Sequence, residues 1–338
     1  MIRFPYPYFG YSLQGFLFGI ANFLVIAAIL RHPRLRTRKE YVAVAALALA
    51  DLINEAAFAE AGIFRIKLTA KEDFGGCQTA WNCLATFHGI GWSLSFPLIF
   101  FMLLAISIDR LICVVWPLDY KSYSIYYSLK LCGAFYALSV VVMGFSVYMS
   151  WLFSVEADPC CRTSSLCFFD QSLGYESVFF ATTGLNLLVG SASVLVYAAI
   201  PFIYSFQVKR LTAMQEMGRP ELIYLYENKR LLVTLGISSV FTFIFMVGTT
   251  IVRMSLYRSL LEPWPIAGII MNLNPIVNTF LFVRRHQDFR VSFMSLLKCQ
   301  RLKIVDHDTS FSDDKSVGGL LNRMSTFTGE PIKDRSRY

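Results

Sequence analysis

The sequence predicts an all-α membrane protein, a seven-transmembrane helix bundle with a short amphipathic helix after the seventh span. Apolar residues make up 55% of the 338 residues and charged residues only 16%, whereas soluble domains carry about 25% charged residues. The apolar residues are concentrated in runs at or near the length of about 20 residues that a helix needs to cross a bilayer. The basic residues lie mainly in alternate connections between these runs, which is typical of membrane topology.

Seven apolar runs define the predicted spans. They are 11–30, 41–64, 84–116, 130–153, 176–206, 231–252 and 263–283. We find no internal repeat, and this disfavours a transporter built from inverted repeats. The net charge of +8 does not indicate nucleic-acid binding, because the basic residues lie between apolar runs and in the tail.

The distribution of Lys and Arg orients the bundle. One side carries 24 of the 31 basic residues, including five within 31–39 and eleven from Arg284 onward. Since cytoplasmic loops carry the excess of basic residues, we expect a plasma-membrane protein with its N-terminus outside and its tail in the cytoplasm. The predicted organisation is a short extracellular N-terminus (1–10), a transmembrane domain (11–283), an inner-face helix (284–300) and a disordered cytoplasmic tail (301–338).

A helical apolar stripe follows the seventh span. Phe289, Phe293, Leu296 and Leu297 lie at i, i+4, i+7 and i+8 and are interleaved with basic residues. This pattern predicts an amphipathic helix on the inner face of the membrane. Cys299 comes directly after it and is a candidate for palmitoylation; an unmodified thiol is the alternative.

Several polar side chains lie inside the apolar spans, where burial is costly and where they face the bundle interior. They are Asn22 in the first span, Asp51 and Asn54 in the second, and Asn274 and Asn278 in the seventh. Amides alone could simply hold helices together. A buried carboxylate such as Asp51, however, must be protonated, paired or bound to a cation. We therefore expect Asn22, Asp51 and Asn274 to share an interior polar network.

Four short motifs follow one another along the chain. They are 19–22 ending in Asn22, 47–51 ending in Asp51, Asp109-Arg110-Leu111, and Asn274-Pro275 with Asn278. Over about 11–298 the chain resembles the rhodopsin-like (class A) G-protein-coupled receptors, and it is most similar to the nematode serpentine chemoreceptors. The resemblance implies a chemosensory receptor, without enzyme activity, cofactor or metal, that activates a heterotrimeric G protein. It also implies arrestin and receptor-kinase contacts through the tail and sensory perception, for example in a cilium.

The resemblance assigns a switch role to one group of residues. Arg110 would pair with Asp109 to hold the cytoplasmic end closed and would contact the G protein once the helices separate. Pro275 would break the seventh helix as a hinge, and Asn274 and Asn278 would complete the switch. The alternative for Arg110 is an ordinary arginine at a helix end, with its charged head in the membrane interface.

Three departures from the family limit what can be carried over. Asn278 stands where a Tyr is usual, and Ile99 stands where a sodium-coordinating Ser is common. The sixth span has neither Pro nor Trp, so we expect the family's kink and aromatic toggle to be absent. Whether a sodium ion binds at Asp51 stays open.

An aromatic face on the third span is the candidate ligand wall. His88, Trp92 and Phe96 lie at i, i+4 and i+8 and share one helical face. By the resemblance this face points into the ligand cavity; a packed aromatic stripe is the alternative. Trp92 stands where amine receptors carry an Asp, and 263–283 contains no lysine. We therefore expect an extracellular ligand that is neither an amine nor retinal.

Three charged residues lie in the outer half of the second span. Glu55 is expected to contact a polar group of the ligand or to pair with His88. Glu60 and Arg65 lie near the outer end of the span, where we expect solvent.

Five of the eight cysteines fall in segments expected outside the cell, where disulfides are permitted. By the resemblance, Cys83 lies about where the family has its third-span cysteine. We expect Cys83 to pair with Cys160, Cys161 or Cys167, with Cys77 as a candidate for a second bond to another of these, and the connectivity stays open. The spacings match no structural zinc site.

Two other functions compete with the receptor. A transporter or ion channel would need paired charges inside the membrane, and only Asp51 and Glu55 are well placed for that. An intramembrane protease would need a facing Ser–His pair or an HExxH-like motif. Ser93 and His88 lie five residues apart on one helix and do not face each other. The receptor is the leading hypothesis, and a seven-helix transporter or channel is the alternative.

Overall fold

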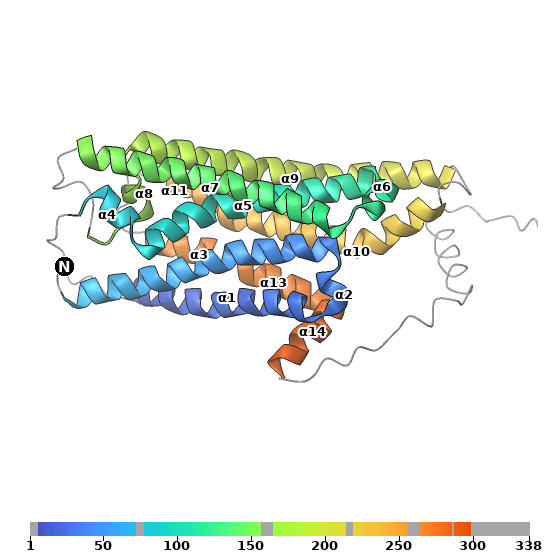
Figure 1. The fold of residues 1–338 in the computed structure, drawn as a ribbon, viewed down its shortest axis with the longest axis horizontal. Helices are drawn as coiled ribbons and strands as arrows, with labels where there is room; N and C mark the ends of the chain where they lie inside the picture. The colour runs from blue at the N-terminus through green and yellow to red at the C-terminus, as the bar shows by residue number, and fades with distance from the viewer. Residues whose placement is uncertain are drawn as a thin grey trace, which may run out of the picture. The chain divides into compact units, whose positions relative to one another are not determined.

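The computed structural model describes residues 6–71, 78–156, 165–213, 219–255, 264–285 and 287–298, and the regular elements in these ranges are helices (Figure 1). The helices belong to one compact unit, Met1–Cys299. Six of the described helices are long and apolar enough to cross a membrane. The first five residues, Cys299 and the predicted tail lie outside the described residues.

Seven spans follow in the predicted order. The first five are α1 (Tyr6–Arg31), α3 (Lys39–Ala70), α5 (Phe87–Val115), α7 (Ile125–Glu156) and α9 (Glu176–Ala213). The sixth comprises α10 (Arg219–Thr242), the π-helix η1 (Phe243–Gly248) and α11 (Thr249–Ser255), and the seventh comprises α12 (Trp264–Met271) and α13 (Asn274–Arg285). The connections hold the short helices α2 (Pro33–Arg36), α4 (Ala80–Leu84), α6 (Pro117–Ser122) and α8 (Phe169–Ser172), and α14 (Gln287–Leu297) follows α13.

The central helix of the bundle is α5. It contacts α3, α7 and α9, and Figure 1 shows it between the α1–α3 pair and the α7–α9 pair. The apolar span of α5 is 72% buried in the bundle, whereas that of α7 is 17% buried. The outer helices expose large apolar side chains such as Phe202, which is 78% exposed. Such a surface suits contact with lipid rather than water.

Small residues let α1 and α3 approach closely. A Cβ atom at Gly15 would stand 2.6 Å from the carbonyl oxygen of Glu55 and 2.9 Å from the Cα of Ala59. Contacts of this kind are a common means of helix association in membranes. The contact holds α3 in one rotation about its axis, and that rotation decides which of its charged side chains enter the bundle.

The sixth span contains an irregularity that the sequence reasoning missed. Because this span lacks proline, we expected no kink, yet residues 243–248 form a π-helix. Single π-turns inside α-helices are frequent at functional sites. Thr242 immediately precedes the π-helix, and its Oγ1 shares one proton between the Ser238 carbonyl oxygen at 3.0 Å and Asn274 Oδ1 at 2.8 Å.

The seventh span is broken next to its proline, as the sequence indicates. Helix α12 ends at Met271 and α13 begins at Asn274, so the chain turns at Asn272 and Leu273. Proline has no N–H donor and disfavours a helical backbone in the residue before it, which explains a break close to Pro275. The turn exposes the Asn272 amide to the bundle interior.

The third span begins later than predicted. The sequence places its start at 84, but α4 ends at Leu84 and α5 begins at Phe87. Thr86 caps α5, because its Oγ1 accepts a hydrogen bond from the Gly89 N–H at 3.1 Å. The continuous apolar run hides this boundary from hydropathy alone.

The predicted amphipathic helix is confirmed as α14. Phe289 is fully buried, while Arg290 and Leu297 are exposed. Ser292 donates from Oγ to the Ala28 carbonyl oxygen at 2.8 Å, so the helix is held against the end of α1. Phe289 and Ser292 therefore face the bundle, whereas Leu297, the last residue of the predicted apolar stripe, is exposed like Arg290.

Candidate functional site

A disulfide stands at one end of the bundle, which we call the Cys83 end. Cys83 at the end of α4 is bonded to Cys167, with their Cα atoms 5.0 Å apart. Of the three partners left open by the sequence, the structure thus selects Cys167. Cys77, Cys160 and Cys161 lie outside the described residues. The bond ties 165–172 to α4 and α5, over the mouth of the helix bundle.

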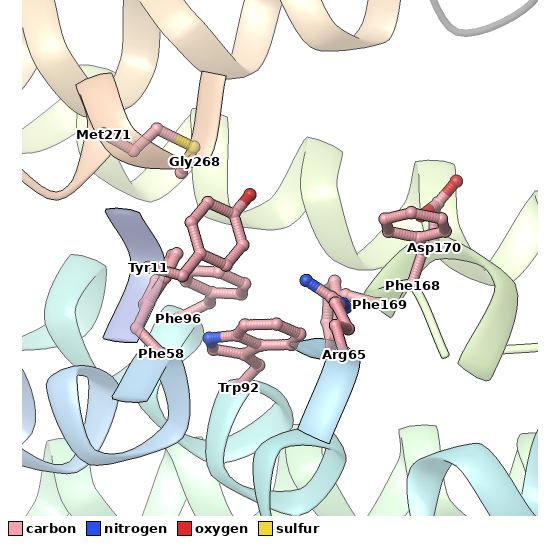
Figure 2. A pocket seen from close by; sticks show the side chains of 10 residues that line it. All are labelled: Tyr11, Phe58, Arg65, Trp92, Phe96, Phe168, Phe169, Asp170, Gly268 and Met271. Carbon is pink, nitrogen blue, oxygen red and sulfur yellow. The ribbon is translucent and has the colours of Figure 1, made fainter. Parts of the chain in front are cut away.

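Beside this disulfide lies a small cavity of about 40 Å³ with mainly aromatic walls (Figure 2). It is lined by Tyr11, Phe58, Arg65, Trp92, Phe96, Phe168, Phe169, Asp170, Gly268 and Met271. Trp92 and Phe96 come from the aromatic face picked out by the sequence. Their rings are 6.4 Å apart and stacked, and the Phe169 ring packs edge-on against Phe96 at 5.2 Å.

The other two candidate ligand residues, Glu55 and His88, do not line this cavity. His88 Nδ1 lies 2.5 Å from Glu60 Oε2, and its ring packs against Trp92 with the centroids 5.3 Å apart. The predicted Glu55–His88 pair is therefore wrong. The reason is helix phase, since Glu60 is more than a turn further along α3 and reaches the first turn of α5, where His88 lies.

Arg65 lies inside the protein, and the expectation that it is solvated is wrong. Its side chain is only 1% exposed. It donates from Nε to the Leu166 carbonyl oxygen at 2.9 Å and from Nη2 to the Cys167 carbonyl oxygen at 3.1 Å. The segment 165–172, tied down by the disulfide, covers this part of α3, which hydropathy along one helix cannot reveal.

A chain of polar contacts crosses the bundle below the cavity. Ser95 Oγ donates to Asn54 Oδ1 at 3.2 Å, and Asn54 Nδ2 donates to Asn272 Oδ1 at 2.8 Å. Asn272 Nδ2 in turn donates to Glu55 Oε2 at 2.6 Å. Sequence reasoning missed Asn272, although a polar residue inside the last apolar span was an available signal. These contacts tie α5, α3 and the break in the seventh span together.

The predicted network of Asn22, Asp51 and Asn274 is not joined by the described hydrogen bonds. All three side chains are buried, but Asn22 Nδ2 and Asp51 Oδ1 have no hydrogen-bond partner among the described residues. Asn274 Oδ1 accepts from Thr242 Oγ1 at 2.8 Å instead. Equal depth along three helices does not bring side chains together, because each helix also has its own rotation.

Asn278 extends the contact between the sixth and seventh spans. Its Oδ1 accepts a hydrogen bond from Ser238 Oγ at 2.5 Å. Together with the Thr242–Asn274 bond, it links α10 to α13 at two points about one helical turn apart. Thr242 precedes the π-helix and Asn274 begins the helix after the break. The irregular parts of the sixth and seventh spans are therefore directly connected.

At the opposite end of α5, which we call the Arg110 end, a charged cluster is buried. Arg110 Nε donates to Asp109 Oδ2 at 3.0 Å, and the Arg110 Nη2 also pairs with that carboxylate. Tyr120 of α6 completes the cluster: its hydroxyl accepts from Arg110 Nη2 at 2.7 Å and donates to Asp109 at 3.0 Å. Asp109 and Arg110 thus pair as the family resemblance implied.

Tyr120 was not identified from the sequence, since nothing marks an aromatic residue in a connection as part of a buried cluster. Burial raises the pKa of its hydroxyl, despite the opposing effect of the Arg110 charge. The hydroxyl therefore stays protonated and can donate to Asp109. Lys39 at the start of α3 stands over the Tyr120 ring at 3.8 Å and donates to the Tyr120 carbonyl oxygen. The cluster is thereby fixed to a second helix.

The chain was compared with known protein families and with curated proteins. The model of the seven-transmembrane receptor (rhodopsin) family matches residues 21–282, which is well over half of the chain. The comparison with curated proteins finds no significant match. Apart from the first part of α1 and the last residues of α13, the matched region contains the spans, and it also contains the disulfide, the cavity lining except Tyr11, and the Arg110 cluster. The chain belongs to the rhodopsin family of seven-transmembrane receptors.

Proposed function

We propose that this receptor is chemosensory and converts the binding of an extracellular ligand into activation of a heterotrimeric G protein. One observation carries the proposal. The aromatic cavity and the Asp109–Arg110–Tyr120 cluster lie at opposite ends of the same central helix, α5. From Trp92 to Arg110 the helix rises by about 27 Å, so a single buried element connects a candidate ligand site with a candidate switch.

The proposed mechanism is a shift between two populations. In the closed state Arg110 is held by Asp109 and Tyr120. A ligand that binds an open state more tightly than the closed one moves the equilibrium by the difference of its two affinities. The π-helix of the sixth span and the turn at Asn272–Leu273 are the irregular points at which helices can move relative to α5.

The orientation and location belong to the same proposal. The cavity faces the outside, the Arg110 end faces the cytoplasm, and the plasma membrane, including that of a sensory cilium, is the proposed location. The excess of Lys and Arg on one side supports this orientation. The tail (301–338) is proposed to contact arrestin and a receptor kinase, with Cys299 as a palmitoylation site. The chain is proposed to have no enzyme activity.

Guanine-nucleotide exchange in membranes from cells that express the chain tests this function. A panel of odorants and peptides is applied to the wild type, to Arg110→Ala and to Arg36→Ala, whose side chain is exposed in α2. We expect ligand-dependent exchange in the wild type and in Arg36→Ala, and its loss in Arg110→Ala. Ion or solute flux without nucleotide exchange would contradict the receptor and favour the channel or transporter.

A further inference from the structure

We propose that the cavity at the Cys83 end binds a short-chain aliphatic carboxylate, whose carboxylate group pairs with Arg65 and whose alkyl group packs against the aromatic walls. This inference rests on the proposed function only in taking the cavity as the ligand site. It adds the chemical class of the ligand and the residue that selects it.

Arg65 carries a buried positive charge. The side chain is 1% exposed, and no described carboxylate lies within ion-pair distance of it, although Asp170 and Glu60 are near enough to act on its charge. Its described hydrogen bonds go to two backbone carbonyl oxygens. A buried cation without a counter-ion is costly, and an anion that reaches it recovers part of that cost.

The guanidinium of Arg65 keeps free donors that face the cavity. The carbonyl oxygens of Leu166 and Cys167 engage Nε and one donor of Nη2. Arginine presents five N–H donors in a planar fork, so donors on Nη1 and Nη2 are left for a further acceptor. Figure 2 shows the guanidinium end of Arg65 directed into the cavity, among the rings of Tyr11, Trp92 and Phe168. A carboxylate is the group that this fork matches in geometry and charge.

The charge of Arg65 disfavours a cationic ligand. Asp170 is the one acidic residue among those that line the cavity. Figure 2 shows its carboxylate directed away from Arg65. The Arg65 guanidinium already stands 4.8 Å from the Phe168 ring and 5.4 Å from the Trp92 ring. These ring faces therefore already contact a cation, and an amine entering the cavity would meet the like charge of Arg65.

The volume of the cavity limits the size of the ligand. An engineered cavity of about 150 Å³ accommodates benzene, whereas this cavity measures about 40 Å³. The cavity therefore favours a ligand smaller than benzene. Acetate and propanoate meet both requirements, since each has an ionised carboxylate and a small apolar body with fewer non-hydrogen atoms than benzene. The methyl groups would lie against Trp92 and Phe96.

The experiment measures binding to the purified full-length receptor in lipid nanodiscs at pH 7 and constant ionic strength. The thermal unfolding midpoint is followed during titration with propanoate, with propanamide as the neutral analogue of the same shape, and with propylammonium. The variants are Arg65→Gln and Arg65→Lys. Lys67→Gln is the matched control, because it removes a positive charge from an exposed position on the same helix.

We expect propanoate, and neither propanamide nor propylammonium, to raise the unfolding midpoint of the wild type and of Lys67→Gln. Arg65→Gln should lose this response, and Arg65→Lys should weaken propanoate binding by roughly 10- to 100-fold, the range set by loss of charge-assisted hydrogen bonds. If Arg65→Gln does not fold, the comparison of propanoate with propanamide on the wild type still decides.

Several outcomes would overturn the inference. They are an equal response to propanamide, a response to chloride alone that matches propanoate, unchanged propanoate binding in Arg65→Gln, and no response of the wild type to propanoate. Nucleotide exchange measured in parallel separates the two proposals. Binding of propanoate without exchange contradicts the G-protein function alone, whereas exchange driven by other ligands and independent of Arg65 contradicts the carboxylate site alone.

Discussion

The two ends of the bundle each hold a buried arginine, and the two arginines have different kinds of partner. Arg65 at the Cys83 end and Arg110 at the Arg110 end are both 1% exposed. Arg110 has a carboxylate beside it in the sequence, Asp109, and a tyrosine hydroxyl that contacts both. Arg65 has two carbonyl oxygens and several aromatic ring faces, with no ion pair among the described residues.

Arg110 therefore forms an internal contact, whereas Arg65 leaves a position open for a ligand. The charge of Arg110 is neutralised within the protein, so its contacts favour one closed arrangement and must be broken for any other. The charge of Arg65 is stabilised by carbonyl dipoles and ring faces, and the Asp170 and Glu60 carboxylates act on it only from a distance. Because a buried charge is most stable when it is paired, Arg65 can gain a counter-ion from an external anion, whereas Arg110 already has one in Asp109.

The largest expected effect is on the internally paired arginine. Asp109→Ala leaves Arg110 buried without its counter-ion, so we expect a loss of about 3–5 kcal/mol in the free energy of unfolding. The released Arg110 should also raise basal nucleotide exchange. Thermal unfolding and basal nucleotide exchange of Asp109→Ala are compared with those of the control Asp119→Ala, in which the replaced side chain is exposed in α6. Equal effects of the two substitutions would show that the Asp109–Arg110 pair has no special role.

Loss of the disulfide should act on the Cys83 end. The bond closes a loop with a sequence separation of 84 residues, and we expect the double substitution Cys83→Ser and Cys167→Ser to lower stability by about 2–4 kcal/mol. It also releases the carbonyl oxygens that hold Arg65. Unfolding midpoints of the double variant and of the wild type with and without dithiothreitol provide the measurement. A midpoint insensitive to the reductant would argue against the bond as a stabilising element.

A smaller effect is expected when only the third member of the Arg110 cluster changes. Tyr120→Phe keeps the ring under Lys39 but removes the hydroxyl that bonds Arg110 and Asp109, which should cost about 1–3 kcal/mol. Tyr123→Phe is the control, since the Tyr123 side chain is exposed. Unfolding midpoints of both variants are compared with the wild type. If Tyr120→Phe is as stable as Tyr123→Phe, the hydroxyl does not hold the cluster.

The smallest effect is expected at the pair that supports the cavity from outside. Glu60 is about one-third exposed where it contacts His88, so Glu60→Gln should change stability by less than about 1 kcal/mol. Propanoate binding at Arg65 should stay within about twofold of the wild type. A large loss of binding in this variant would mean that the charge of Glu60, and not only that of Arg65, sets the ligand preference.

Much of the fold follows from local sequence properties. The length and hydropathy of the apolar runs predict the spans, because a helix must satisfy its own backbone in lipid. The amphipathic spacing of Phe289 and Phe293 predicts α14, and Pro275 indicates the break in the seventh span. The Asp109–Arg110 pair is also readable, since its two members are neighbours. Each of these features depends on one segment and its solvent.

The features that the tertiary structure decided involve two or more segments. Arg65 is buried because 165–172 is bonded back over α3, and His88 pairs with Glu60 because of the relative rotation of α3 and α5. Tyr120 enters the Arg110 cluster from a connection, and Asn272 reaches Glu55 only because the seventh span turns there. Position along one helix gives depth in the membrane, but contact also requires the rotation and approach of another element. For this reason the sequence alone predicted the bundle and the Asp109–Arg110 pair, and only the packed structure revealed a buried arginine beside the cavity that has no ion pair among the described residues.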